Sequence, residues 1–305
     1  MDISLVVLLK LSLSFTVIIL GYIANTVLKI EKDSIAKLLL YIFVPLLFFS
    51  SVVKLEVTKM NVLIPLLVAL ASSTSCMIIL KCKFLYPDNN TRRFLAFASP
   101  NANVGYFLLP IATYLFNQEV LGVFILIITG NIIYENTFGF YIAAKGNFTA
   151  RESFIKLLRL PAMYALLAAM LVSILNLEIP AVFDDLFLQI RSAYSLFGMM
   201  IVGMALADIT WTKLDFRYIS TAFIGKFIIQ PMVTLTLITI DKNLLNIFDP
   251  QIYQLLMLAS MAPLAANNIV FCTILKSSQP KAASAILLTT VFAAVCIPWA
   301  IKFIL

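Results

Sequence analysis

Long apolar segments with short charged connections between them constrain the fold of this chain more than any other feature. Ten such segments lie at residues 3–27, 34–53, 60–80, 93–116, 119–143, 155–176, 182–207, 216–240, 251–275 and 282–304. Each is close to or longer than the roughly 20 residues that a helix needs to cross the hydrocarbon core of a bilayer. A transmembrane barrel would instead need short segments of alternating polarity. The sequence therefore predicts an all-α polytopic membrane protein with ten transmembrane helices.

The composition agrees with this class of protein and excludes several kinds of functional site. Hydrophobic residues make up 62% of the 305 residues and charged residues only 12%, with a mean hydropathy of +1.02. Soluble domains are far more polar. The chain has no histidine, so zinc or haem sites of the usual kind and a His-based catalytic triad are excluded. Its four cysteines form no CxxC pair, and we expect no disulfide framework, no metal site and no cofactor.

Basic residues gather in alternate connections between the segments. Fifteen of the 22 lysines and arginines follow the first, third, fifth, seventh and ninth segments, whereas the other side has four, counting Lys302 at the C-terminal end. Cytoplasmic connections carry such an excess of Lys and Arg. We expect both termini outside and the connection 146–159 in the cytoplasm, in a membrane such as the bacterial inner membrane. The net charge of +7 is then a topology signal, and no nucleic-acid partner is expected.

The connection 146–159 divides the chain into two parts, 1–145 and 160–305, with five segments each. Because five is an odd number of crossings, the second part begins on the opposite side of the membrane from the first. Any homology between the two parts must therefore be an inverted repeat, an arrangement that many secondary transporters share.

Two segments at corresponding positions of these parts are interrupted by proline. The fourth contains Pro100, Gly105 and Pro110, the ninth contains Pro263, and both Pro100 and Pro263 stand five residues after a Leu-Ala pair begins. Proline removes a backbone donor and clashes with the preceding turn. Broken backbone at membrane depth is tolerated only where it is buried in protein or lines a cavity. Simple proline kinks are the alternative, but paired interruptions predict a transport site near the midplane.

Four asparagines next to the two prolines are the candidate substrate-binding residues: Asn101, Asn103, Asn267 and Asn268. Broken helices expose backbone N–H groups and the positive ends of half-helix dipoles, which suit a carboxylate. Asparagine adds amide donors without a fixed charge. The alternative is that these side chains only hydrogen-bond one helix to another.

Other polar residues inside the segments are candidates for coupling or cavity lining: Glu135, Asn131, Asn136 and Lys226. Ionisable residues in a membrane are costly and are functional candidates by default. The sequence leaves open whether Glu135 and Lys226 meet, and whether the asparagines line a cavity or join helices. Arg191 lies near the outer end of its segment, where we expect its side chain to snorkel to the surface.

Several short motifs recur in an order and spacing that resemble a known family. They are Tyr41-Ile42-Phe43-Val44-Pro45-Leu46, Pro100-Asn101 with Gly105 and Pro110, Leu160-Pro161, Gly203-Met204-Ala205-Leu206, Lys226-Phe227-Ile228-Ile229-Gln230-Pro231, Pro263 with Asn267 and Asn268, and Ala282-Ala283-Ser284 through Pro298. Across essentially its whole length the chain resembles the auxin efflux carrier family, which includes bacterial malate and malonate permeases and the plant auxin carriers.

The resemblance implies ten helices in two inverted five-helix repeats, with a scaffold and a transport domain. In this family the fourth and ninth helices break at proline and cross, and asparagines bind carboxylates there. Carried over, Pro100 and Pro263 mark the crossover, and Asn101 with Asn267 or Asn268 faces the substrate. The third segment departs from the plant members, because Ser72-Ser73-Thr74-Ser75 stands where they use a carboxylate and a lysine. The long regulatory loop of the plant carriers is also absent.

The expected function is secondary active transport of small organic anions, such as malate, malonate or auxin-like acids, by an elevator mechanism. The chain is not expected to be an enzyme, and no GxxxxGK[ST] motif for ATP is present. A sodium-coupled symporter of organic anions, like the bile-acid symporters of similar fold, is the main alternative. A non-transporting sensor and a channel also stay open. The expected partners are the anion and the bilayer, with a second copy of the chain left open.

Overall fold

Helices account for the fold. The computed structural model describes residues 3–53, 59–109, 111–112, 116, 118–175, 177, 179–209 and 214–304, and within these ranges the chain forms helices and no sheet. Six helices are long and apolar enough to cross a membrane, or seven if one bent pair of helices is a single span. The prediction of an all-helical, membrane-embedded protein is confirmed at this level. Pro110 lies outside the described residues.

The helices follow the predicted apolar segments along the chain. Up to residue 145 they are α1 (Ile3–Thr26), α2 (Lys32–Leu38), η1 (Leu39–Phe43), α3 (Val44–Val52), α4 (Lys59–Lys81), α5 (Asn89–Ala98), η2 (Val104–Leu108), α7 (Gln118–Asn136) and α8 (Phe138–Ala144). Beyond it they are α9 (Ala150–Leu158), α10 (Pro161–Ile174), α11 (Val182–Leu206), α12 (Phe216–Ile224), η4 (Gly225–Ile229), α13 (Gln230–Ile240), η5 (Asp241–Leu245), α14 (Pro250–Ser260), α15 (Asn268–Ile274) and α16 (Gln279–Ile304). The η segments are short stretches of wider, π-helical turns.

The connection 146–159 contains a helix that the apolar pattern did not predict. Thr149 accepts a hydrogen bond from the backbone of Glu152, and the Glu152 carboxylate accepts one from the backbone of Thr149. This capping box starts α9 at Ala150. The chain then bends by 48° before α10, where Pro161 stands at the first position of the new helix, a position that favours proline.

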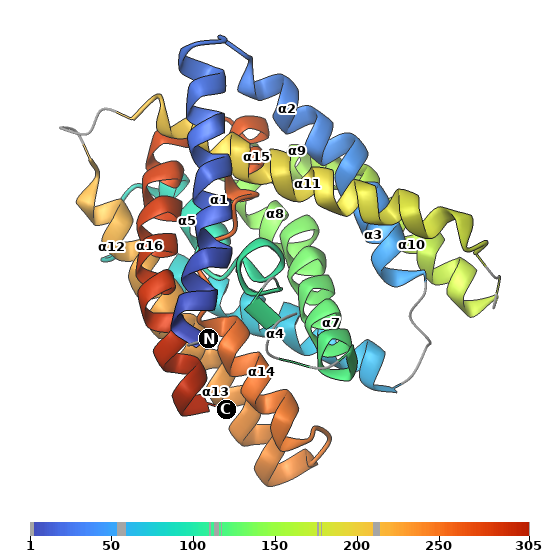
Figure 1. The fold of residues 1–305 in the computed structure, drawn as a ribbon. Coiled ribbons are helices and arrows are strands. Elements are labelled where there is room, and N and C mark those ends of the chain that lie inside the picture. The colour runs from blue at the N-terminus through green and yellow to red at the C-terminus, as the bar shows by residue number, and fades with distance from the viewer. Residues whose placement is uncertain are drawn as a thin grey trace.

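The helices pack in two groups. In the first, α1 packs along α11, α3 packs along α10, and α2 with η1 also contacts α11. In the second, α4 packs along α7 and α5, α5 packs along α8, and α12, α14 and α15 pack against α16. Figure 1 shows α3, α10 and α11 on one side of the molecule and α12, α13, α14 and α16 on the other. We call them the α11 group and the α4 group, the latter including η2, η4 and α13.

The contact between α1 and α11 depends on glycine. A Cβ atom at Gly203 would lie 1.8 Å from the carbonyl oxygen of Ile18, and one at Gly21 would lie 2.0 Å from the carbonyl oxygen of Met200. No real Cβ atom comes so close to backbone. Small residues at helix interfaces allow this close approach, which is how membrane helices gain packing energy without a hydrophobic driving force.

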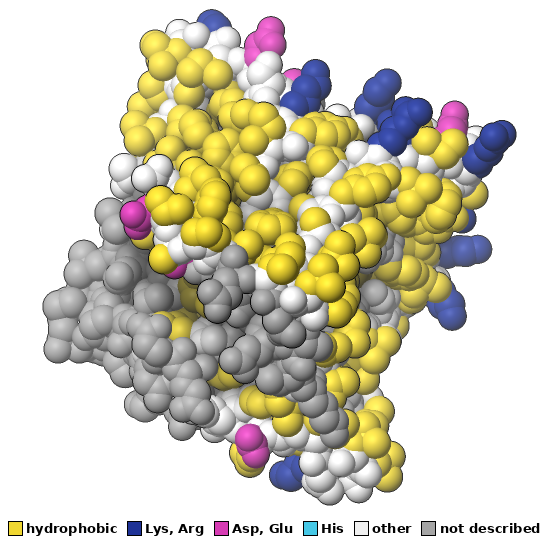
Figure 2. All heavy atoms as spheres, turned by 90° about the vertical axis from the view of Figure 1, so that its right-hand side faces the viewer, with side chains coloured by type: hydrophobic (Ala, Val, Ile, Leu, Met, Phe, Trp, Pro, Cys, Tyr) yellow, Lys and Arg dark blue, Asp and Glu magenta, His cyan; other side chains and the backbone are white. Residues whose placement is uncertain are grey.

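The exterior is largely apolar, as expected for helices that face lipid. Figure 2 shows hydrophobic side chains over much of one described face, with Lys and Arg side chains at its upper and right-hand edges. Leu171 and Ile174 on α10, and Val295 and Trp299 on α16, are more than half exposed. Apolar surface of this kind would be a liability in water, whereas in a bilayer it is in contact with lipid.

Candidate functional site

The gap between α5 and η2 faces the gap between α14 and α15. The backbone N–H of Asn103 donates to the carbonyl of Pro263 (2.8 Å), and the N–H of Ala265 donates to the carbonyl of Asn101 (2.9 Å). These bonds form a short antiparallel bridge. Pro100 also lies in a gap, so both helices are interrupted where the sequence predicted. The backbone of each break thus supplies hydrogen-bond partners for the backbone of the other. Irregular backbone is tolerated inside a membrane protein when its polar groups are paired in this way.

A chain of hydrogen bonds fixes the orientation of the carboxamides beside this bridge. The carbonyl of Ala98 accepts a bond from Nδ2 of Asn268 (3.1 Å), which leaves Oδ1 of Asn268 to accept from Nδ2 of Asn101 (3.1 Å). The same Nδ2 of Asn101 donates to Oε2 of Glu135 (2.9 Å). The amide nitrogen of Asn101, and not its oxygen, is therefore the atom that faces Glu135.

Glu135 collects donors from further residues. Nδ2 of Asn267 lies 3.3 Å from Oε1 and 3.4 Å from Oε2 of Glu135. Nδ2 of Asn136 donates to the carbonyl of Ile132 (3.0 Å) and lies 3.5 Å from Oε1 of Glu135. Glu135 is only 2% exposed. The carboxylate thus joins α7 to both breaks, and neutral amides supply its hydrogen bonds.

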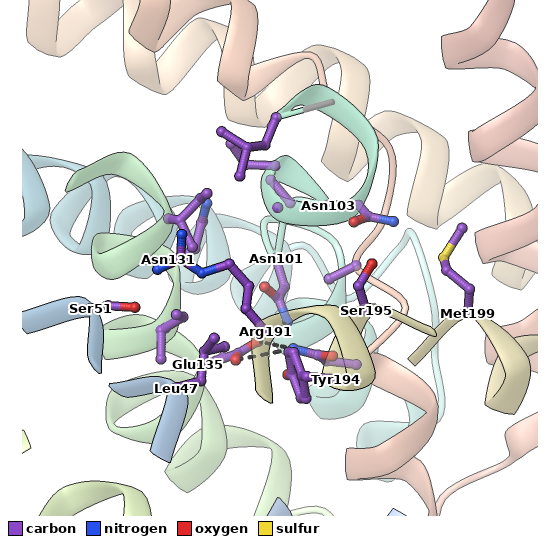
Figure 3. Close-up of a pocket in the computed structure, with 18 of the residues that line it drawn as sticks. Leu47, Ser51, Asn101, Asn103, Asn131, Glu135, Arg191, Tyr194, Ser195 and Met199 are labelled. Atoms are coloured by element: carbon purple, nitrogen blue, oxygen red, sulfur yellow. Dashed lines mark hydrogen bonds between the residues drawn. The ribbon is translucent and has the colours of Figure 1, made fainter. Parts of the chain in front are cut away.

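A cavity of about 470 Å³ lies against the paired breaks, within the size range of small-molecule sites. The α4 group contributes the polar wall residues Asn101, Asn103, Asn131, Glu135 and Asn267, together with Gly105. The α11 group contributes Leu47, Ser51, Arg191, Tyr194, Ser195 and Met199, among others. Figure 3 shows labelled side chains of both groups around a common space, among them Asn101 and Glu135 of the α4 group and Arg191 of the α11 group. The cavity therefore lies at the boundary between the two groups.

Arg191 is a residue for which the sequence interpretation expected only a side chain that snorkels to the surface. It lines the cavity, and Figure 3 shows its side chain extending from α11 on the side where Asn131 is labelled. No hydrogen bond or ion pair joins Arg191 to another described residue; the ion pairs of the described chain are Lys32 with Asp208 and Lys281 with Asp215. The sequence signal for a role in the site is a charged side chain within an apolar segment. Whether that side chain reaches the surface or a cavity depends on how α11 packs, which the sequence does not show.

No protein-family model matches this chain. No curated protein matches it either. The function must therefore be argued from what the residues around the cavity can do.

The remaining candidates divide between the cavity and the protein interior. Asn131 lines the main cavity and also a second cavity of about 20 Å³ that it shares with Gln230. Lys226 does not line the main cavity. It is fully buried on η4, its Nζ has no hydrogen-bond partner among the described residues, and no ion pair joins it to Glu135. The two ionisable residues that the sequence singled out are therefore not paired.

The wall of the cavity is suited to holding an anion. It combines amide nitrogens, a guanidinium and the backbone of two broken helices. Charge-assisted hydrogen bonds from such donors are about twice as strong as neutral ones. Within the described chain, no three His, Cys, Asp or Glu side chains are grouped so that they could hold a metal ion.

Proposed function

We propose that this protein is a secondary active transporter of small organic anions, taking mono- or dicarboxylates such as malate, malonate or auxin-like acids. The observation that carries the proposal is the cavity beside the paired breaks, where Arg191 and the carboxamides of Asn101 and Asn267 line one space. An organic anion that enters a membrane loses hydration energy unless the protein replaces its hydrogen bonds. Amide donors and helix ends at membrane depth can do so without binding the anion irreversibly.

We further propose that the chain is a ten-helix member of the auxin efflux carrier family, with inverted repeats at 1–145 and 160–305. In such a repeat α1 is equivalent to α10, and α3 is equivalent to α11. The contact of α1 with α11 would then be the counterpart of the contact of α10 with α3, and both contacts occur. The contacts of α4 with α5 and of α13 with α14 are a second such pair. These matching contacts support the inverted repeat.

The proposed mechanism is alternating access of the elevator type. The α11 group, held together by the glycine contact of α1 with α11, serves as the scaffold. The α4 group carries the paired breaks and moves along the scaffold with the bound anion. The position of the cavity at the boundary between the groups supports this division, because such a boundary can open to either side. The termini then lie outside and α9 in the cytoplasm, in a bacterial inner membrane.

Counterflow in proteoliposomes tests the function whatever charge moves with the anion. Vesicles loaded with unlabelled malonate would take up labelled malonate, and malate, succinate, indole-acetate and taurocholate would be tried as competitors, each with and without sodium. We expect saturable counterflow that does not need sodium. Asn101→Ala and Asn267→Ala should abolish it, whereas Asn90→Ala, at an exposed position, should not.

Each other result points to a different function. A strict need for sodium would replace the proposal with a sodium-coupled symporter, and flux that never saturates would replace it with a channel. Anions that raise the melting temperature of the purified protein but show no counterflow would indicate a sensor. Absence of both binding and counterflow, in protein shown to be folded, would contradict the proposal.

A further inference from the structure

We infer that Glu135 is a built-in competitor of the transported anion, and that a proton must neutralise it before the anion can bind. This inference rests on the proposed function, and it names the coupling ion as a proton. Glu135 lines the same cavity as the asparagines and holds their donor atoms in the empty protein. The transporter would then move each anion together with one proton.

Both amide hydrogens of Asn101 are already donated to protein groups. A carboxamide nitrogen has two hydrogens to donate. On Asn101, Oδ1 of Asn268 takes one of them and Oε2 of Glu135 takes the other. No hydrogen is left for a substrate carboxylate. The bond to Asn268 is held in place by the carbonyl of Ala98, so the bond to Glu135 is the one that can be exchanged.

Glu135 also takes the donor of the second break. Its two oxygens lie 3.3 and 3.4 Å from Nδ2 of Asn267. One carboxylate thus bridges the donors of both breaks, which is the arrangement that we expect of a bound substrate carboxylate. Glu135 therefore occupies the site as an internal substitute for the anion.

The negative charge of Glu135 is a second obstacle to the binding of an anion. Two titratable side chains of α11, Arg191 and Tyr194, line the same cavity as Glu135. Tyr134 precedes Glu135 on α7, and Cys76 of α4 lies against Tyr134. Only Arg191 among these is charged at neutral pH, and α3 adds uncharged Leu47 and Ser51 to the wall. With ionised Glu135 present, an entering carboxylate would bring a second negative charge into a site with one cation, and burial makes uncompensated charge costly.

Protonation removes both obstacles. A proton from water adds to one oxygen of Glu135, which becomes a neutral carboxylic acid and a weaker acceptor. The amide hydrogens of Asn101 and Asn267 then turn to the substrate carboxylate, whose charge is balanced by Arg191. After the site opens to the other side, the anion leaves, the proton returns to water, and the Glu135 carboxylate takes back both donors.

Calorimetric binding of malonate and malate to the purified protein tests this inference at a series of pH values from about 6 to about 8.5. Because one proton must bind with each anion, affinity should fall by about tenfold for each pH unit above the pKa of Glu135. Glu135→Gln is neutral at every pH, so its affinity should stay the same over the series. Glu31→Gln, at an exposed position, should behave as the unmodified protein.

A second readout needs no variant. Heats of binding measured in buffers of different ionisation enthalpy give the number of protons taken up, which should approach one per anion at the upper end of the series. Affinity that does not depend on pH, no proton uptake, or a pH dependence that persists in Glu135→Gln would overturn the role of Glu135 while leaving anion transport standing. Failure of every anion to bind at any pH would instead contradict the proposed function itself.

Discussion

Arg191 is a cation on the wall of a cavity inside a membrane-embedded protein, where an uncompensated charge is costly. Its side chain is neither fully exposed nor tied to another described residue by a hydrogen bond or ion pair. A cost of this kind is offset when an anion binds opposite the charge. The positive charge of Arg191 thus makes the cavity favour anions, an effect that the neutral asparagines alone would not have.

Replacing Arg191 should therefore weaken anion binding. A hydrogen bond to a charged group contributes about 1.5–3 kcal/mol, so we expect Arg191→Gln to raise the dissociation constant of malonate by about tenfold or more. Arg191→Lys keeps the charge and should lose less. Calorimetry on the purified protein measures both, with Arg159→Gln as the control because Arg159 is exposed. Equal affinity of Arg191→Gln and the unmodified protein would remove Arg191 from the site.

Asp215, which lies just before the span that begins at Phe216, anchors a second polar cluster at the ends of the spans. Its carboxylate accepts bonds from the hydroxyl of Tyr86 (2.6 Å) and the backbone of Tyr218 (2.9 Å), and it pairs with Nζ of Lys281 (2.8 Å). Burial alone would raise the pKa of Asp215, but the bonds from Lys281 and Tyr86 outweigh it and lower the pKa below its ordinary value. The cluster links the chain before α5 to the beginnings of α12 and α16.

The lowered pKa of Asp215 fixes the sign of a pH effect. The ionised form is favoured by folding, so its contribution to stability is present above the unfolded pKa of about 4 and is lost as pH falls through the lower folded pKa. Asn also caps helices well, but its Nδ2 cannot accept the bonds that Tyr86 and Lys281 donate to Oδ2, so Asp215→Asn should cost the ion pair and one hydrogen bond, about 1–2 kcal/mol at neutral pH. Thermal unfolding should show this difference at pH 7, and the difference should shrink in acid. A difference that grew in acid would contradict the assignment.

At the scale of elements, close packing of α1 on α11 is what holds the α11 group together. Gly203→Ala would place a methyl group against the backbone of α1, so the helices must separate and lose contacts. We expect a loss of about 1–3 kcal/mol, as for other overpacked sites, with a lower melting temperature in detergent. Gly122→Ala is the matched control, because no atom lies within 4 Å of a Cβ atom placed there. Equal melting of the two variants would mean that this contact is not tight.

The elements that could be predicted from the sequence are those with a local cause. Proline disfavours continuation of a helix, which predicts the breaks at positions 100 and 263, although Pro65 and Pro298 lie inside the continuous helices α4 and α16. Apolar length indicates a span without knowledge of its neighbours. The capping box of α9 is also a local signal, but it is made of polar residues and is not part of the apolar pattern. The eighth segment continues past its expected end at residue 240 as the wider turns of η5, in which the buried Asp241 carboxylate accepts bonds from the backbone of Ile247 and Phe248.

The contacts that complete the site could not be predicted, because they join residues far apart in the sequence. Glu135 meets Asn101 and Asn267 across 34 and 132 residues, and nothing in either local pattern says that they face each other. The same is true of Lys226, which is as polar as Glu135 but lies away from the cavity. Candidate residues can be chosen from a sequence because polar side chains are rare in apolar segments and costly to bury there. Their partners, in contrast, depend on how the helices pack.

At the scale of the whole molecule, the two helix groups share the cavity between them. The α11 group supplies the guanidinium, the α4 group supplies the amides and Glu135, and an anion bound there would contact both. Relative movement of the groups would carry these contacts from one side of the membrane to the other. A static cavity with the same residues would bind an anion but would remain open to one side only.

Labelling of a cysteine in the cavity tests this account most directly. Ser195 lines the cavity on α11, and Ser195→Cys would be made with Cys76, Cys82, Cys272 and Cys296 replaced by alanine. A membrane-impermeant thiol reagent would be applied to proteoliposomes from either side in turn. Ser34→Cys, at an exposed position where the predicted second span begins, serves as the control.

We predict that the cysteine at position 195 reacts with reagent applied from either side, and that malonate slows the reaction at a concentration that matches its dissociation constant. The control cysteine should react from one side only, at a rate that malonate does not change. Reaction of position 195 from one side under every condition, or at a rate indifferent to malonate, would contradict the claim that this cavity carries an anion across the membrane.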